Sequence, residues 1–401
     1  MNYEDLLYRA RRWRALIRPS TISAAWYDIN LWKRRDPGSA RILQEGFIWL
    51  ARAQDRSTSA DGGIARHFSL VSGWSSSYPE TTGYILNTWF ERLATTKDRD
   101  FAARIGKALA WLSSIQLADG GFPGGVVGSG IPVPVVFNTG QIVLGLAESV
   151  HQGYHTGDSL IRAANWLLSL QEDDGSWQQG ARLHAPGTAR TYDTHVAWGL
   201  FAASAATGQA VYAEAARKNI EWTLKNQQPN GWFAECSLWG PERTLTHTLA
   251  YALRGVVEGF HFTREERWLA AAQKTADAFL SLQKKDGSIS GCFDSKWKPT
   301  ASWICLTGLS QIALCWMRLY ELTGDSRYFE AALPANAFVR RTMHLGCSSD
   351  ESGGVLGSYP MWGDYCTYQY VNWAAKFTLD ANMLEEKLLA RLSLQAESPL
   401  P

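Results

Sequence analysis

The sequence lacks the features that mark several large classes of protein. No apolar run approaches the roughly 20 residues that cross a bilayer, and the first five residues form no apolar signal core. The six cysteines include no Cys-x-x-Cys pair, which argues against zinc binding and thiol redox chemistry. A glycine-rich loop of the kind that cradles phosphates or dinucleotides is also missing. We therefore expect a cytoplasmic protein with reduced thiols that needs no metal ion and no cofactor.

A large excess of charge of one sign is missing as well. Lysine and arginine total 39 against 38 for aspartate and glutamate, and the resulting formal net charge of +1 argues against general binding of nucleic acid. Positive charge nevertheless crowds the first segment, at Arg9, Arg11, Arg12, Arg14, Arg18, Lys33, Arg34 and Arg35. We expect residues 1–40 to form a basic helical segment packed on the rest of the chain. Peripheral contact with an anionic membrane is the alternative role of this segment.

What the chain does contain is an internal repeat. A tryptophan stands five residues before a glutamine, and an Asp/Asn-Gly turn follows the pair, in four places: Trp49/Gln54, Trp111/Gln116, Trp166/Gln171 and Trp222/Gln227. A fifth copy keeps the glutamine and the turn at Gln283, Asp286 and Gly287. Recurrence at about 55 residues is typical of one supersecondary unit that is stacked many times.

Each repeat reads as two helices. An amphipathic helix ends in the Trp/Gln sequence, and a more apolar helix follows after a polar loop. The second helices are expected to begin near residues 81, 138, 192, 245, 306 and 370. Six such pairs predict an all-α fold, an (α/α)6 toroid in which the inner helices are covered on both faces. We expect the toroid to span residues 41–384, with a degenerate sixth outer helix at Phe338 and Met343, and a C-terminal tail at 385–401.

The Trp/Gln pairs are interpreted as structural. The indole would pack against the neighbouring unit, while the glutamine amide would bond exposed backbone at a helix end. Each pair would then hold adjacent units together, and the chemistry would lie elsewhere.

The repeat resembles the glutamine-tryptophan motifs of terpene cyclases and the related repeats of protein prenyltransferases, over nearly the whole chain. The resemblance implies the toroid architecture. Their catalytic motifs are missing, since the chain has no DxDD sequence and only a reversed Cys292-Phe293-Asp294 where a prenyltransferase has its Asp-x-Cys zinc ligands.

A second resemblance concerns residues 61–70 and 73–78. The sequence DGGIARHFSL followed by GWSSSY looks like the DGGW…R-x-L…GW-x-S run in the catalytic helical domain of glucuronyl C5-epimerases. That family implies the same toroid and inversion of C5 of uronate residues within a polysaccharide. Residues 77–84 and 372–377 also resemble toroid proteins found with bacterial surface-polysaccharide synthesis, which implies a poly- or oligosaccharide partner.

Candidate catalytic residues stand at the starts of the inner helices, which converge at one mouth of a toroid. Glu80 follows Pro79 and is a candidate general acid or base, with a helix cap as the structural alternative. Tyr192, Asp193 and His195 begin the third inner helix, and His247 has the corresponding place one unit later. A cap at Asp193 and a hydrogen-bonded core histidine at His195 are the alternatives there.

Candidate substrate-binding residues are cations, amides and aromatic rings near the same mouth. Arg66 is placed by the epimerase-like run and suits a sugar carboxylate, because a guanidinium donates two parallel hydrogen bonds. The full set is Arg66, Trp74, Tyr78, Tyr84, Asn138, Gln141, Arg243, Trp303, Tyr359 and Trp373.

We expect a carbohydrate-active enzyme that removes the C5 proton of a uronate, as a uronyl C5-epimerase or a polysaccharide lyase. In this mechanism Arg66 neutralises the carboxylate, Glu80 or a neighbouring tyrosine takes the proton, and Tyr192 or His195 returns one. Three alternatives stay open: a glycoside hydrolase that pairs Glu80 with Asp193, a non-catalytic glycan-binding protein, and an isoprenoid cyclase or transferase.

Overall fold

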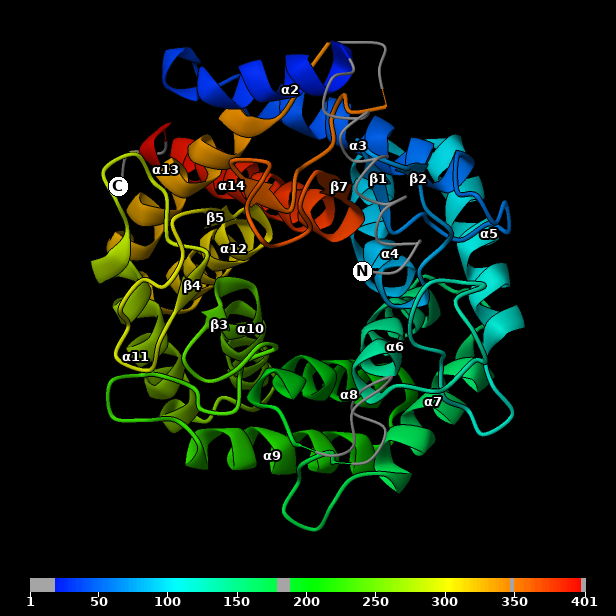
Figure 1. Ribbon diagram of the computed structural model, residues 1–401. Coiled ribbons are helices and arrows are strands. Elements are labelled where there is room, and N and C mark those ends of the chain that lie inside the picture. Colours follow the sequence, from blue (N-terminus) through cyan, green and yellow to red (C-terminus); the bar gives the residue numbers. More distant parts are fainter. Residues whose placement is uncertain (1–18, 179–187, 347–349, 398–401) are drawn as a thin grey trace, which may run out of the picture.

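The computed structural model describes residues 19–178, 188–346 and 350–397, and these form two concentric rings of helices (Figure 1). The inner ring contains α4 (Pro79–Thr96), α6 (Val136–His151), α8 (Thr194–Thr207), α10 (Thr246–Thr263), α12 (Leu306–Thr323) and α14 (Asn372–Glu397). The outer ring contains α3 (Ser39–Asp55), α5 (Arg99–Ile115), α7 (Gly157–Ser169), α9 (Ala210–Lys225), α11 (Glu266–Leu282) and α13 (Ser326–Thr342). The fold is the expected (α/α)6 toroid.

The two rings differ in burial, as their sequences predict. In α5, the buried residues Phe101, Ile105, Leu109 and Leu112 recur every three or four positions, so one stripe faces the inner ring. In α12, almost every residue from Leu306 to Met317 is buried, because both faces of this helix are covered. All six inner helices begin within about two residues of the expected starts.

The repeated glutamines connect neighbouring outer helices. Gln116 Nε2 donates to the carbonyl of Gly120 in its own turn and to that of Ser159 in α7, both at 2.9 Å. Gln171 bonds Gly175 and Ala215 in the same way. The expected contact with exposed backbone at a helix end is therefore present, and a second bond reaches into the next outer helix. Each glutamine thus joins two repeats.

The repeated tryptophans pack on the glycine turns. A Cβ added to Gly63 would lie 2.6 Å from the Trp111 ring, and one added to Gly121 would lie 2.8 Å from the Trp166 ring. Trp49 of the first unit contacts the last unit, because its Nε1 donates to the carbonyl of Asp350 at 2.8 Å. The tryptophan and the small residue of the turn therefore fit together between units.

Short strands in the loops before the inner helices shape one mouth of the ring. β1 (His67–Ser69) pairs antiparallel with both β2 (Gly73–Trp74) and β7 (Gln369–Val371), so the first and last units share a sheet. Two further antiparallel pairs join β3 (Thr244–Leu245) to β4 (Cys292–Phe293) and β5 (Ile304–Cys305) to β6 (Ser358–Tyr359). These strands fix the entry of α4, α10, α12 and α14.

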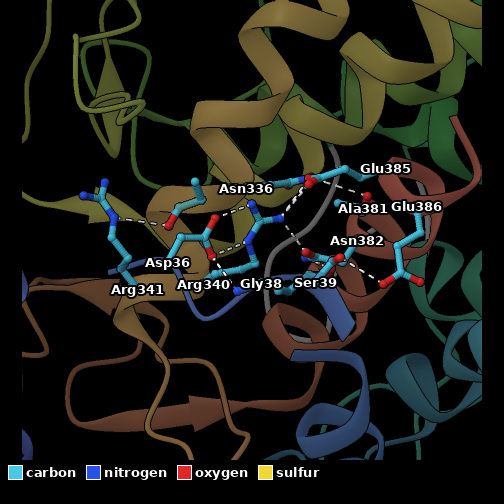
Figure 2. Close-up of polar contacts among 12 residues, drawn as sticks. Asp36, Gly38, Ser39, Asn336, Arg340, Arg341, Ala381, Asn382, Glu385 and Glu386 are labelled. Atoms are coloured by element: carbon cyan, nitrogen blue, oxygen red, sulfur yellow. Dashed lines mark hydrogen bonds and ion pairs between the residues drawn. The ribbon is translucent and has the colours of Figure 1, made fainter. Parts of the chain in front are cut away.

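A buried ionic cluster also closes the ring. Arg340 of α13 donates to Glu385 of α14 at 2.9 Å and to both carboxylate oxygens of Asp36, which precedes α3 (Figure 2). Asn336 and Asn382 complete the cluster. The C-terminal tail expected from residue 385 is wrong for the described residues, since α14 continues to Glu397 and buries Leu388.

The N-terminal segment is described from residue 19 onward, and Arg9, Arg11, Arg12, Arg14 and Arg18 lie outside the described residues. Helix α2 (Pro19–Ile29), followed by the turn η1 (Leu31–Lys33), lies on the outside of the ring (Figure 1). Asp28 accepts from the backbone N–H of Met361 at 2.6 Å, so α2 is anchored there. Its Ile22, Trp26 and Ile29 are exposed. Contact of this segment with a membrane stays a prediction.

None of the described helices combines the length and the apolar character that a transmembrane span requires. The five described cysteines are free thiols, and Cys347 lies outside the described residues.

Candidate functional site

A cavity of about 460 Å³ lies at the mouth where the inner helices begin. Seven of the residues expected at the site line it: Arg66, Tyr78, Glu80, Asn138, Tyr192, His247 and Trp373. Arg66 directly precedes β1 and the others lie at or just before the starts of α4, α6, α8, α10 and α14, so residues far apart in sequence are brought together around one hollow.

Glu80 is held at the first turn of α4 by two neighbours. The hydroxyl of Tyr78 donates to Glu80 Oε2 at 2.6 Å, and Arg66 lies close enough for its charge to act on the carboxylate. Burial raises the pKa of Glu80 to about 7, although the Tyr78 hydrogen bond and the Arg66 charge both lower it. A carboxylate with this pKa exchanges protons readily at neutral pH. Glu80 is therefore equipped for acid–base chemistry.

Arg66 has no carboxylate within ion-pair distance among the described residues. Its Nη1 donates to His67 Nδ1 at 3.1 Å and to Gln369 Oε1 at 3.3 Å, and its guanidinium carbon lies 4.8 Å from the centroid of the Trp373 ring. These contacts hold the guanidinium in place without neutralising it. A positive charge that is oriented but unpaired at a cavity suits an anionic ligand.

Two tyrosines meet in a floor beneath the cavity, and of these Tyr251 lines it. Tyr84 lies one helical turn below Glu80, and Tyr251 lies one turn below His247. The two hydroxyls meet at 3.5 Å. Because α4 and α10 stand three places apart in the inner ring of six, this contact crosses the centre of the toroid. Glu80 and His247 therefore lie on opposite walls above a shared aromatic floor.

His247 is neutral in this position. Its Nδ1 donates to Gln311 Oε1 at 2.6 Å, which leaves the lone pair on Nε2. Burial lowers the pKa of His247 to about 4, and the Gln311 bond opposes this change. Rings of Tyr251 and Tyr365 pack around the imidazole at 4.5 and 5.7 Å between centroids. Nε2 of His247 can accept a hydrogen bond from a ligand hydroxyl.

His195 repeats this arrangement but does not line the cavity. Its Nδ1 contacts Gln141 Oε1 at 2.6 Å, and the rings of Trp198 and Tyr251 cover it. Burial lowers the pKa of His195 well below its ordinary value. The expectation that His195 and Gln141 reach the ligand is therefore not met, and the core alternative fits His195.

Several other expected residues lie away from the cavity. Asp193 is buried behind Tyr192 in the turn η2 (Thr191–Asp193) and is not among the residues that line it. Trp74 packs on Trp49 and Phe68. The remaining residues have structural partners elsewhere: Tyr84 in the floor, Arg243 paired with Asp364, Trp303 over Gly291 and Gly363, and Tyr359 bonded to the carbonyl of Asp28.

The cavity also contains residues that the sequence did not single out. Phe137 directly precedes the expected Asn138, and Thr248 directly follows His247. The places of both in the cavity could therefore have been inferred from these neighbours. Tyr251 follows His247 by one helical turn, a spacing that places it on the same face. Tyr365 gives no such signal, because it comes from the long loop before α14, and its hydroxyl accepts from Trp373 Nε1 at 3.0 Å.

Metal ligands are not gathered at the site. Across the described part of the chain, no three His, Cys, Asp or Glu side chains are grouped closely enough to hold an ion. The described residues that line the cavity present hydroxyls, one carboxylate, one guanidinium, an imidazole, an amide and aromatic faces. This set of groups suits a polar ligand that carries an acidic group and a ring whose flat faces can pack on the aromatic side chains.

Sequence comparison relates part of the chain to a known family. Residues 88–254 match the model of the squalene-hopene cyclase C-terminal domain, which is less than half of the chain. No curated protein matches the sequence. The resemblance to terpene cyclases thus holds for the toroid architecture.

Solved structures with the same fold cover nearly the whole chain. An unsaturated glucuronyl hydrolase specific for heparin is similar with a TM-score of 0.71 and 14% identity, over 88% of this chain and 98% of that one. A D-mannose isomerase gives 0.69 and 12%, over 87% and 97%. Cellobiose 2-epimerase from Bacillus thermoamylovorans gives 0.67 and 11%, over 90% and 99%. At these identities the similarity shows the fold.

Proposed function

We propose that the protein is an enzyme that removes the C5 proton of a uronate residue in an oligo- or polysaccharide. The observation that carries this proposal is the pairing of Glu80 with Arg66 in one cavity. Glu80 is the only carboxylate among the described residues that line the cavity, and burial brings its pKa to about 7. Arg66 acts on Glu80 through its charge, but no carboxylate among the described residues lies within ion-pair distance of it.

The two side chains have complementary roles. Removal of the C5 proton pushes negative charge onto the neighbouring carboxylate, which is already ionised. Arg66 neutralises that charge with two parallel hydrogen bonds. Its contacts with Gln369 and Trp373 hold the guanidinium in place for this role. Glu80 is the general base, because its ionised form is present at neutral pH and the pKa of its acid form is matched to that pH.

Epimerisation at C5 takes two proton transfers. The C5–H bond breaks, the proton passes to a carboxylate oxygen of Glu80, and the electron pair moves between C5 and C6, which places charge on the carboxylate held by Arg66. A new C5–H bond then forms with the hydroxyl proton of Tyr192, which lines another wall of the cavity. The Tyr192 oxygen regains a proton that Glu80 releases through solvent. For a lyase, the electron pair instead expels the C4 substituent and leaves a C4–C5 double bond.

The sequence leaves either Tyr192 or His195 as the residue that returns the proton. Tyr192 lines the cavity and His195 does not, so Tyr192 returns the proton. His247, neutral and with Nε2 free to accept, binds a sugar hydroxyl opposite Glu80.

The structural relatives support the carbohydrate class. The three described above are named as a glucuronyl hydrolase, a mannose isomerase and a cellobiose epimerase. All of these names refer to sugars, and one refers to a uronate. The pairing of Glu80 with Asp193 that a hydrolase would use is disfavoured, because Asp193 does not line the cavity.

An isoprenoid enzyme is the second candidate. Tyr78, Phe137, Tyr192, Tyr251 and Trp373 give the cavity an aromatic wall, and the squalene-hopene cyclase match points the same way. Against it, an unpaired guanidinium and an ionisable carboxylate at the wall suit a charged ligand better than a hydrocarbon.

Incubation with uronate glycans in deuterium oxide tests the proposal. Deuterium at C5 is expected with the natural protein and should be lost in Glu80→Gln, which keeps the shape and removes the base. New ultraviolet absorbance would identify a lyase, and a new reducing end alone would identify a hydrolase. Retained exchange in Glu80→Gln would overturn the assignment of the base.

Glu91→Gln is the matched control. Glu91 lies on the same helix, three turns further from the mouth, and its pKa is also raised by burial and by Asp380. This variant should exchange deuterium at the natural rate, which separates loss of chemistry from damage to α4. Unchanged activity in every Glu80 variant, together with glycan binding, would indicate a non-catalytic glycan-binding protein.

A further inference from the structure

A second cavity of about 460 Å³ adjoins the first, and Leu238 lines both. It lies under the loop that joins α9 to β3, and its walls include Trp232, Trp239 and Arg190. Neither the repeat motif nor the expected catalytic residues account for it. Its position makes it the natural place for the sugar next to the one in the central cavity.

Trp239 is the prominent side chain of this second cavity. The residue is 45% exposed, which is unusual for tryptophan in a chain where most tryptophans are buried. The loop fixes it, since Ser237 Oγ accepts from the backbone N–H of Trp239 at 3.1 Å and of Gly240 at 3.0 Å. The Arg243 guanidinium lies 5.1 Å from the centroid of its ring. The backbone at Trp239 is therefore held by the loop, and the indole contacts Arg243, Trp303 and Tyr365 while nearly half of the residue stays exposed.

An aromatic track connects the two cavities. Trp373, beside Arg66, donates to the hydroxyl of Tyr365, and the Tyr365 ring lies 6.5 Å from that of Trp239 between centroids. Tyr365 lines the central cavity and Trp239 lines the second one. Flat apolar faces in sequence, with polar groups between them, suit consecutive sugar rings, whose C–H faces pack on aromatic rings.

The cavity on the other side of the centre has a different character. It shares Gly124 and Gly125 with the central cavity, but its walls are formed mainly by the loop before α6, including Pro123, Ile131 and Val133, and none of the described residues that line it has an aromatic or charged side chain. The side with Trp239 also carries Arg190 and Arg243, paired with Glu235 and Asp364. Each arginine is neutralised by its carboxylate partner, so this side is polar and aromatic, and a polar glycan is better matched to it than to the apolar walls on the other side.

We infer that the second cavity is a sugar subsite in which Trp239 stacks on the residue next to the reacting uronate, so that the substrate is an oligosaccharide of acidic character. This inference rests on the proposed function and adds the direction and the minimum length of the bound chain. Trp239 touches the substrate away from the reacting carbon, so it contributes to affinity for long ligands and not to proton transfer.

Calorimetric binding to the full chain tests the inference, with methyl glucuronide as the short probe and tetrasaccharides of heparosan and hyaluronan as the long probes. Trp239→Ala should weaken tetrasaccharide binding about tenfold and leave methyl glucuronide unchanged. Trp239→Phe should retain most of the affinity. Trp26→Ala removes another exposed indole, on α2 outside the cavities, and should change neither.

The outcomes separate the two proposals. Equal affinity of natural protein and Trp239→Ala for a bound tetrasaccharide would overturn the subsite and leave the uronate chemistry standing. Equal weakening of both probes would also overturn it, because the change would then act on the central cavity. Failure of the natural protein to bind any of the three probes would count against the proposed function and the subsite together.

Discussion

Glu80 owes its acid strength to burial and to two neighbours that act in the opposite direction. Burial alone favours the protonated acid, while the Tyr78 hydroxyl and the Arg66 charge favour the carboxylate. The balance leaves a pKa of about 7, which neither a surface carboxylate nor a fully apolar pocket would give. The chemistry of this residue is therefore a property of the site, and its pH dependence is the most direct readout.

The rate of C5 exchange should rise with pH through about 7. Glu80 acts as a base, so only its ionised form is active, and that form is lost as the pH falls through the raised pKa. Initial rates of deuterium incorporation between about pH 5 and 9 measure this profile. A rate that falls through the same range would show that Glu80 acts in its protonated form.

Replacing Arg66 by glutamine should change two quantities at once. Its charge lowers the pKa of Glu80, so the profile should move to higher pH when the charge is removed. The KM for a uronate glycan should rise by about tenfold or more, since a charge-assisted hydrogen bond contributes about 1.5–3 kcal/mol. Arg66→Lys keeps the charge and should restore the profile but not the KM.

The surface variant Arg56→Gln serves as control for Arg66. Arg56 is 60% exposed and its pair with Asp350 is long, at 3.6 Å. A shift in the profile of this variant would show that general charge, rather than the place of Arg66, controls Glu80.

At the scale of elements, mutation can test how much a repeated glutamine contributes to the stability of the fold. Gln116→Ala removes the bonds from Nε2 to Gly120 and Ser159 and the bond that its oxygen accepts from the Ser159 hydroxyl at 2.8 Å. We expect a loss of about 1–3 kcal/mol in the free energy of unfolding, measured by denaturant titration. Gln152→Ala, which removes one exposed bond to Glu148, should change it by less than about 0.5 kcal/mol.

Helix α2 should be attached in a pH-dependent way through Asp28. Burial raises the pKa of Asp28 to about 7, while the N–H of Met361 opposes this. A raised pKa in the folded state means that stability is greatest below the ordinary value near 4 and is lost as the pH rises through about 7. Ionisation of Asp28 therefore lowers the free energy of unfolding by up to about 4 kcal/mol at alkaline pH. Asp28→Asn should flatten the pH dependence of the melting temperature, and an unchanged dependence would exclude this carboxyl as its source.

The elements were predictable because they depend on local periodicity. The six inner helix starts follow from apolar runs that come after polar loops, and the glutamine contacts follow from one repeated motif. How deeply a side chain is buried within the ring could not be predicted in this way. His195 and His247 are each the second residue of an inner helix, yet one is buried under Tyr251 and the other lines the cavity. The turn η2 precedes α8 and packs against α10, a contact between elements far apart in the chain that no spacing in the sequence encodes.

At the scale of the molecule, the fold is a closed circle, and closure places the site. Arg66 comes from the first unit, while Gln369 and Trp373, which hold it, come from the last. A chain that formed the same helices without joining its ends would leave Arg66 unsupported. Tyr365, from the final loop, could not be predicted for the same reason, because its position depends on contacts between units at opposite ends of the chain.

The ionic cluster of Figure 2 gives a test of closure. Arg340 is 5% exposed and contacts Asp36, Asn382 and Glu385, so Arg340→Met would leave the buried carboxylate of Glu385 without its cation. We expect the free energy of unfolding to fall by about 3–5 kcal/mol. Arg327→Met, on the same helix, removes an exposed pair with Asp325 and should leave the free energy of unfolding nearly unchanged.

The double variant Arg340→Met/Glu385→Gln distinguishes a buried charge from lost packing. It removes the uncompensated carboxylate and should recover part of the stability of Arg340→Met, since the largest cost comes from leaving one ion alone in the interior. Closure also predicts that Arg340→Met weakens uronate binding, although Arg340 lies outside the cavity, because α14 carries both Trp373 and Glu385. Natural affinity in a clearly destabilised Arg340→Met protein would show that the site is assembled independently of this cluster.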